Sequence, residues 1–346
     1  MNPLSLIGLI GAVGLAAAAS AQTPPSAVVP VAPHYGQGEP LGNYETGVII
    51  DRYIGDPAIS PTRIAHEALF TQRIFGPGDF RTGSAGAVLP SGQVTDLATL
   101  RPGDATPLMA SAQQTIFYVD KGRGRLDDGA RVWDLYSDIA VAVPANVVYR
   151  LTNAEATPLK MVRFSFTPRP GSPPLGAIQV RDSHKVGMSA KGVLWNVNAK
   201  ALFGPEVGVE RVMLVSLGPM TLTGPSALPT QADPSDGSEQ WIRVSSEDSP
   251  GNTADMVLQL GSEVREWPVH AGYVAPADGQ VVHGQYNVGD TIEDALVIVG
   301  PRRGMTVMDG PPGVWPAPPQ KGQAPSAATV RSWRESLVPG RPLASR

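Results

Sequence analysis

The sequence contains no cysteine among its 346 residues. This absence excludes disulfide bonds, thiolate zinc sites, cysteine-ligated iron–sulfur clusters and a cysteine nucleophile. Positive charge is not in excess either, because 27 basic and 31 acidic side chains give a formal net charge of −4. Binding to nucleic-acid phosphates favours a basic surface, so we expect no nucleic-acid partner.

Residues that interrupt helices are abundant. The chain has 38 glycines and 35 prolines, well above the usual combined share of about 12%. Glycine costs backbone entropy in a helix and proline lacks the N–H donor, so the composition disfavours an all-α fold. A hydrophobic fraction of 42% with 17% charged residues is enough for a buried core and excludes global disorder.

The N-terminus has the features of an export signal. Residues 4–19 form an apolar run, and Ala19-Ser20-Ala21 fits the small-x-small rule for signal peptidase, although no lysine or arginine precedes the run. A membrane anchor is the alternative, but the run is shorter than the ~20 residues that a span needs. We expect cleavage after Ala21, a periplasmic or secreted location, and no membrane span in the mature chain.

The rest of the chain divides by composition into two β domains. Short apolar runs are separated by turn residues, and residues 139–143 alternate Ile or Val with Ala, which is typical of a strand with one preferred face. The predicted parts are a signal peptide (1–21), a Pro/Ala/Gly-rich linker (22–47), a first domain (48–170), a connection (171–190), a second domain (191–303) and a Pro/Gly-rich C-terminal tail (304–346). Within the tail, only residues 327–337 favour a helix.

Two segments share most of the pattern Pro-x-Gly-x-x-His-x-x-x-Asn. Residues 144–153 keep the proline, the spacing and the final Asn153, with Tyr149 at the histidine position. Residues 279–287 keep His283 and the final asparagine, with the preceding proline two residues too far away. This pattern is the second conserved motif of the cupin superfamily, and the chain therefore resembles the two-domain cupins, or bicupins. The resemblance covers most of residues 50–300 and implies an all-β fold of two cupin-like β-barrels (double-stranded β-helices, or jelly rolls) in tandem.

Most metal ligands of the cupin family are missing. Its first motif supplies a histidine pair and a glutamate, and here Thr115 stands at the glutamate position of the first domain and Glu239 at that of the second. Neither domain has the histidine pair. A cupin metal usually has three imidazoles and a carboxylate, which suit iron, manganese, nickel or zinc. The resemblance thus implies no certain cofactor and, at most, one divalent transition metal held by Glu239 and His283.

The family register also implies which residues face the inside of the second barrel. Glu239, Trp241 and Arg243 alternate along one strand, and His283 lies on a neighbouring strand. A buried arginine and a buried glutamate need partners, so we expect an Arg243–Glu239 pair beside Trp241. Arg243 and Trp241 would then bind an anionic or hydroxylated small molecule. If the register slips by one residue, Ile242 faces the core instead.

The corresponding face of the first barrel is mostly apolar. The family register places on it Thr115, Phe117, Val119, Tyr149, Leu151 and Asn153. This set predicts a filled structural core, and a pocket for an aromatic or acyl ligand is the alternative.

These residues favour a binding protein over an enzyme, with both classes left open. The first hypothesis is an exported bicupin that binds a small organic molecule, anionic or hydroxylated, in the second barrel. The alternative is a cupin-type enzyme (an oxygenase, isomerase, lyase or decarboxylase) acting on a small organic acid, aromatic or sugar at an incomplete metal site of Glu239 and His283. A metal-independent enzyme would use Tyr149 or His283 as acid or base. A homodimer is a further candidate assembly.

Overall fold

The computed structural model describes residues 50–78, 85–168, 174–190, 196–223, 239–245, 255–275, 282–301 and 327–343. The predicted signal peptide and linker lie outside these residues. The described chain is almost wholly β and contains a single α-helix, α1 (Ala327–Glu335), so both the all-β prediction and the helix expected in the tail are confirmed. None of the helices in the described ranges is long and apolar enough to cross a membrane.

The first barrel consists of two antiparallel sheets. Its large sheet has the strand order β12-β9-β6-β11-β5-β3-β2, with β4 (Ala87–Leu89) pairing in parallel with β3, and its small sheet has the order β10-β7-β8-β23. The large-sheet strands are β2 (Arg63–Ala65), β3 (Leu69–Pro77), β5 (Gln93–Leu100), β6 (Gln114–Lys121), β9 (Ile139–Val143), β11 (Leu159–Phe166) and β12 (Gln179–Asp182). The small-sheet strands are β7 (Gly124–Asp127), β8 (Arg131–Leu135), β10 (Arg150–Thr152) and β23 (Arg341–Pro342).

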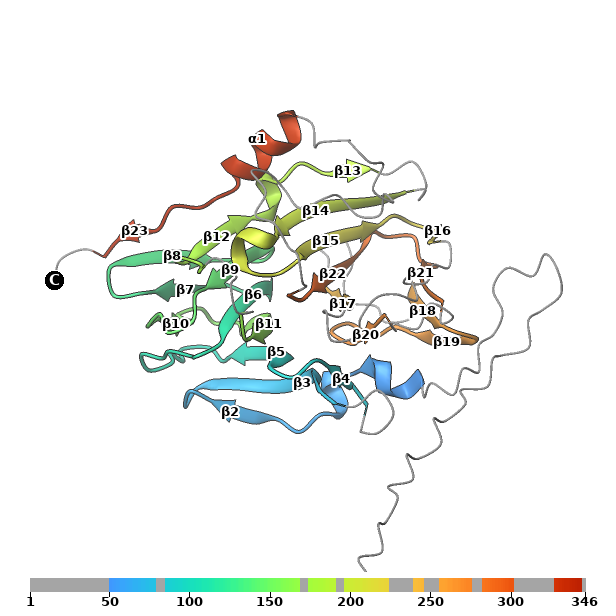
Figure 1. Ribbon diagram of the computed structural model, residues 1–346, viewed down its shortest axis with the longest axis horizontal. Coiled ribbons are helices and arrows are strands. Elements are labelled where there is room, and N and C mark those ends of the chain that lie inside the picture. Colours follow the sequence, from blue (N-terminus) through green and yellow to red (C-terminus); the bar gives the residue numbers. More distant parts are fainter. Residues whose placement is uncertain are drawn as a thin grey trace, which may run out of the picture.

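The second barrel repeats this arrangement. Its large sheet has the order β1-β20-β17-β22-β15-β14-β13, and its small sheet β16-β21-β18-β19. The large-sheet strands are β1 (Ile54–Gly55), β13 (Ser189–Ala190), β14 (Val197–Phe203), β15 (Arg211–Leu217), β17 (Glu239–Val244), β20 (Gly272–Val274) and β22 (Glu293–Val299). The small-sheet strands are β16 (Thr221–Leu222), β18 (Met256–Leu260), β19 (Glu263–Glu266) and β21 (His283–Asn287). The green strands of the first barrel and the orange strands of the second form two neighbouring bodies in Figure 1.

Short strands exchange between the barrels. β1 precedes the first barrel in the chain but pairs with β20 of the second, and β23 follows the second barrel but pairs with β8 of the first. The expected connection at residues 171–190 contains β12, which closes the first large sheet, and β13, which starts the second. In the described part of the chain, four 3₁₀ helices complete the elements: η1 (Ile50–Tyr53), η2 (Pro57–Ile59), η3 (Ser183–Lys185) and η4 (Pro205–Val207). The two barrels are therefore tied together at both ends of the described chain.

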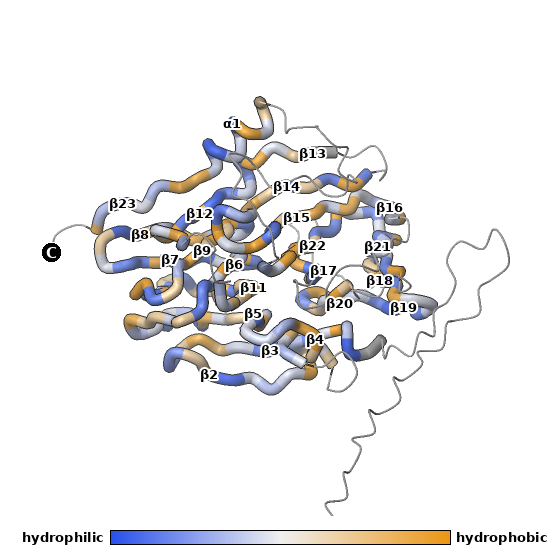
Figure 2. Tube along the Cα trace, viewed as in Figure 1, coloured by the Kyte–Doolittle hydropathy of each residue, from blue (hydrophilic) through white to orange (hydrophobic). Residues whose placement is uncertain are grey.

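Strand β9 shows how the large sheets are buried on both faces. Ile139, Val141 and Val143 lie in the core inside the first barrel, whereas Ala140 and Ala142 lie in a second core that both barrels share. The expected preferred face is thus the barrel interior, but the opposite face is buried too, because the second barrel covers it. Small alanine side chains allow this close approach. Hydrophobic residues accordingly run along strands in the middle of the molecule in Figure 2.

The outer faces of the two large sheets form the interface between the barrels. Phe164 and Phe166 of β11 share one buried cluster with Leu214 of β15 and Ile242 of β17. Burying each such side chain contributes about 1.5–3 kcal/mol. The two barrels therefore share one hydrophobic core and cannot separate without exposing it.

Candidate functional site in the second barrel

Strand β17 presents different residues to its two faces. Gln240 points toward the first barrel, where its Oε1 accepts a hydrogen bond from the Thr95 hydroxyl. Trp241 points into the second barrel and stacks on Tyr273 of β20, with ring centroids 6.2 Å apart and an interplanar angle of 5°. The inward register expected for Trp241 is therefore observed, and a slip by one residue is excluded.

Tyr273 connects this wall to the small sheet that closes the barrel. Its ring centroid lies 5.9 Å from that of His283 on β21, and its hydroxyl oxygen accepts a hydrogen bond from Gln285 Nε2. The side chains of Tyr273, His283 and Gln285 are all buried. The two sheets of the barrel thus bring aromatic and polar groups together in its interior.

Glu239 adds an acidic side chain to this interior. Its carboxylate is buried and accepts a hydrogen bond from Trp241 Nε1 at 2.8 Å. Within the described part of the chain, Glu239 forms no ion pair. Burying a carboxylate without a counter-charge costs free energy. Such groups are found preferentially at functional sites, where they can contact a ligand.

The neighbouring titratable groups are held neutral. Burial lowers the pKa of His283, and the charge of Glu239 opposes this only in part. Burial and the same charge raise the pKa of Tyr273 well above its usual value, although the hydrogen bond from Gln285 acts in the opposite direction. Near neutral pH His283 is therefore a neutral imidazole and Tyr273 a protonated phenol. Together with the Gln285 amide and the Glu239 side chain they can accept and donate hydrogen bonds to a polar ligand.

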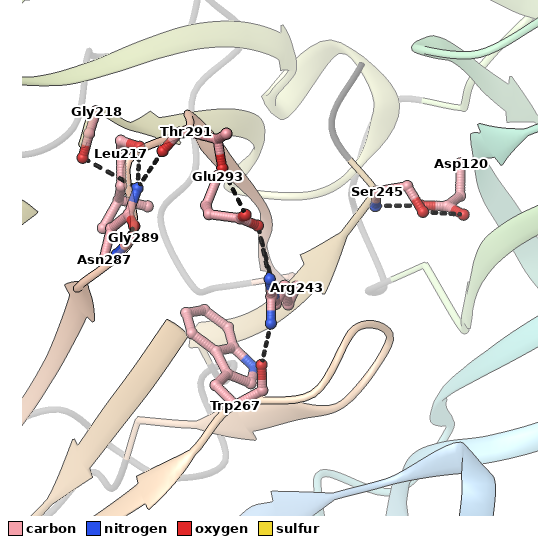
Figure 3. A network of polar contacts seen from close by, with 10 residues as sticks. All are labelled: Asp120, Leu217, Gly218, Arg243, Ser245, Trp267, Asn287, Gly289, Thr291 and Glu293. Atoms are coloured by element: carbon pink, nitrogen blue, oxygen red, sulfur yellow. Dashed lines mark hydrogen bonds and ion pairs between the residues drawn. The ribbon is translucent and has the colours of Figure 1, made fainter. Parts of the chain in front are cut away.

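The predicted Arg243–Glu239 pair is wrong. Arg243 pairs with Glu293 of β22: Nη2 and Nε lie 2.8 and 3.2 Å from Glu293 Oε2, and Nη1 donates to the Trp267 carbonyl at 2.7 Å (Figure 3). The physical reason is strand geometry. Residues four apart on one strand share a face but are separated by about 13 Å along it. Glu293 lies on the adjacent strand β22, two residues from Ala295, which is the register partner of Arg243. Both partners are fully buried.

The corresponding positions of the first barrel form a packed core, as predicted. Phe117 and Val119 lie in its inner hydrophobic cluster with Tyr149, whose ring contacts Phe117 edge-on at a centroid distance of 6.2 Å. The Thr115 hydroxyl is hydrogen-bonded to the Ser165 hydroxyl at 3.2 Å. Burial raises the pKa of Tyr149 to about 12, so its phenol stays protonated. Tyr149 therefore lies in a different barrel from the other candidate residues, Glu239, Trp241, Arg243 and His283.

The asparagine that ends each motif has the same structural role in both barrels. Asn153 donates to the carbonyls of Leu100 and Thr157 and accepts from the Glu155 N–H. Asn287 donates to the Leu217, Gly218 and Thr291 carbonyls and accepts from the Gly289 N–H (Figure 3). Each side chain is fully buried and holds the turn between two strands. The repeated spacing in the sequence thus reflects a loop that is repeated in both barrels.

The described residues do not fit a metal centre. They include no group of three or more histidine, aspartate or glutamate side chains close enough to hold an ion. Glu239 and His283 are two of the ligands implied by the resemblance to cupins, and neither His270 nor His184 supplies a third, since their imidazoles bind Asp120 and Asp182.

Sequence reasoning missed three residues of this interior: Tyr273, Gln285 and Glu293. Gln285 could have been found from its position two residues after His283, because alternate residues of a strand share a face. Tyr273 and Glu293 lie on β20 and β22, and the register of these strands relative to β17 depends on pairings between distant segments.

Comparison with known proteins supports the fold alone. No family model matches the chain, and no curated protein matches its sequence. Among solved structures, a putative glyoxylate-induced protein from Pseudomonas aeruginosa has 12% identity and a TM-score of 0.55, covering 80% of this chain and 97% of its own. Tomato vicilin (8%, TM-score 0.53) and Lactobacillus farciminis oxalate decarboxylase (9%, TM-score 0.51) each cover 73% of this chain, and 86% and 87% of their own. The fold is that of a bicupin, as the sequence resemblance implies.

Proposed function

We propose that the second barrel binds a small organic molecule that carries hydroxyl groups. The observation that supports this is the buried carboxylate of Glu239, which is placed beside neutral His283 while the equivalent interior of the first barrel is packed with apolar side chains. Hydroxyl groups of a ligand would donate to Glu239. The parallel rings of Trp241 and Tyr273 offer a flat apolar surface for the C–H groups of the same molecule.

The pairing of Arg243 narrows the class of ligand. Its guanidinium is already neutralised by Glu293 and hydrogen-bonded to the Trp267 carbonyl. Among the residues that the structure describes, no second arginine is then available to offset the repulsion between an anionic ligand and Glu239. A neutral hydroxylated molecule fits this interior better than an organic acid.

The Glu239→Gln variant should bind such a ligand at least about tenfold more weakly, because it loses hydrogen bonds to a charged group, which are worth about 1.5–3 kcal/mol. The measurement is isothermal titration calorimetry with a panel of neutral monosaccharides and polyols. Tyr149→Phe is the matched control in the first barrel and should leave binding unchanged, with a stability cost of about 1 kcal/mol at most. If Tyr149→Phe loses binding while Glu239→Gln and His283→Ala retain it, the binding site lies in the first barrel and the proposal is wrong.

A cupin-type enzyme is the second candidate, because His283 is held neutral beside Glu239. A neutral imidazole is the form that accepts a proton or binds a metal. Elemental analysis of protein purified without a histidine tag separates the candidates. About one equivalent of a transition metal per chain would favour the enzyme, and a metal-free protein that still binds polyols would favour the binding protein.

We also propose that the chain is exported and cleaved after Ala21, on the basis of the apolar run and the Ala19-Ser20-Ala21 site. Mass spectrometry of the protein from a Gram-negative host should find Gln22 at the N-terminus of the periplasmic or secreted form. The variant Ala21→Arg, with a large charged residue before the cleavage point, should accumulate uncleaved. Intact Met1 on the wild-type protein in a membrane fraction would instead indicate an anchor.

A further inference from the structure

A polar cavity of about 400 Å³ lies on the outside of the first barrel, away from the interior of the second. Three connections between strands form it together with η3. Arg123 comes from the turn between β6 and β7, Tyr136 and Ser137 from the turn between β8 and β9, Glu155 and Thr157 from the loop between β10 and β11, and His184 from η3. The cavity is therefore built from segments that are distant in the sequence and fixed by the strands they join.

One wall of this cavity is held rigidly by a buried carboxylate. Asp182 Oδ2 accepts a hydrogen bond from the Tyr136 hydroxyl at 2.9 Å, and Asp182 Oδ1 lies 3.0 Å from both the backbone nitrogen and Nδ1 of His184. The rings of Tyr136 and His184 stack, with centroids 6.3 Å apart. Burial, together with the hydrogen bond to Asp182, raises the pKa of Tyr136 to about 12. Because both rings are fixed before any ligand arrives, a ligand would not have to order them.

The cavity also contains two opposite charges that are not used within the protein. Arg123 and Glu155 form no ion pair with each other or with any other residue in the described ranges. Nearby arginines of the same barrel behave differently, since Arg125 pairs with Asp134 and Arg150 with Asp127. The hydroxyls of Ser137 and Thr157 likewise have no hydrogen-bond partner among the residues that the structure describes.

We infer that this cavity is a binding site for a free amino acid. A molecule with a carboxylate and an ammonium group can bind Arg123 with one end and Glu155 with the other, so that each unused charge gains a partner. The guanidinium fork matches a carboxylate, and the stacked rings of Tyr136 and His184 offer a face for the amino acid side chain. The site lies in the first barrel, so it is independent of the ligand proposed for the second.

The test is saturation-transfer NMR with the proteinogenic amino acids as probes, each at millimolar concentration. At least one should bind the wild-type protein, and its affinity should fall at least about tenfold in Arg123→Gln and in Glu155→Gln, since each variant removes a charge-assisted hydrogen bond. The N-acetylated and amidated derivatives of the same amino acid should bind as weakly to the wild type as the free amino acid does to the variants.

Arg125→Gln is the matched control, because Arg125 is an exposed arginine two residues from Arg123 that does not line the cavity. It should retain wild-type affinity, and thermal melting should show that all three variants are folded. Failure of every amino acid to bind the wild type would overturn the inference. An equal affinity for the free and the N-acetylated amino acid, or wild-type affinity in both Arg123→Gln and Glu155→Gln, would do so as well.

Discussion

The substitution Arg243→Ala should lower the free energy of unfolding by about 3–5 kcal/mol, the usual cost of removing one partner of a buried ion pair. Arg243 and Glu293 both have side chains exposed by 1% or less, and the guanidinium also donates to the Trp267 carbonyl. The substitution leaves the Glu293 carboxylate in the interior without its counter-charge. Urea unfolding followed by circular dichroism measures the loss as a lower midpoint at a similar slope.

A double variant separates the charge effect from a general defect in packing. Arg243→Leu with Glu293→Leu removes both charges and keeps apolar volume, so it should recover most of the stability lost in Arg243→Ala. The control is Arg265→Ala, which breaks the half-exposed Arg265–Glu263 pair on the same barrel and should cost about 0–1 kcal/mol. If the double variant is as unstable as the single one, the ion pair is not the cause.

The partner of Arg243 shows where sequence reasoning stops. Alternation along β17 correctly predicts that Trp241 and Arg243 share the inner face, because side chains of a strand alternate with period two. The same alternation places Glu239 on that face but about 13 Å away along the strand, which the sequence reasoning overlooked. Identifying Glu293 requires the pairing of β17 with β22, and that pairing joins segments about fifty residues apart.

The fold was more predictable than the contacts between the barrels. The spacing from Tyr149 to Asn153 and from His283 to Asn287 recurs because both asparagines hold the same kind of turn. The exchanged strands β1 and β23 have two residues each, which is too short for a periodic signal. The sequence also does not reveal that both faces of the large sheets are buried. A strand covered on both sides differs from a half-exposed one only in the residues of its second face.

A buried carboxylate lies at the interface between the barrels, and we expect its removal to have the second largest effect on the stability of the protein. Asp120 of β6 in the first barrel accepts hydrogen bonds from the Ser245 backbone N–H at 2.6 Å and from its hydroxyl at 3.2 Å, and its Oδ2 lies 2.9 Å from His270 Nε2 (the Ser245 contacts are in Figure 3). Ser245 and His270 belong to the second barrel. Burial alone would raise the pKa of Asp120, but the hydrogen bonds from His270 and Ser245 hold it below its usual 3.8.

This direction fixes how the stability of the protein depends on pH. A carboxyl group with a lowered pKa in the folded state stabilises the fold above its unfolded pKa, and the contribution is lost as the pH falls through the folded pKa. Asp120→Asn should therefore lower the free energy of unfolding by about 3 kcal/mol near pH 7, and the difference from the wild type should shrink below about pH 4. Urea unfolding at several pH values measures both effects. Asp104→Asn, which breaks the exposed Arg101–Asp104 pair, should change stability little at any pH. A constant difference between wild type and Asp120→Asn across the whole pH range would show that the charge of Asp120 does not stabilise the contact between the barrels.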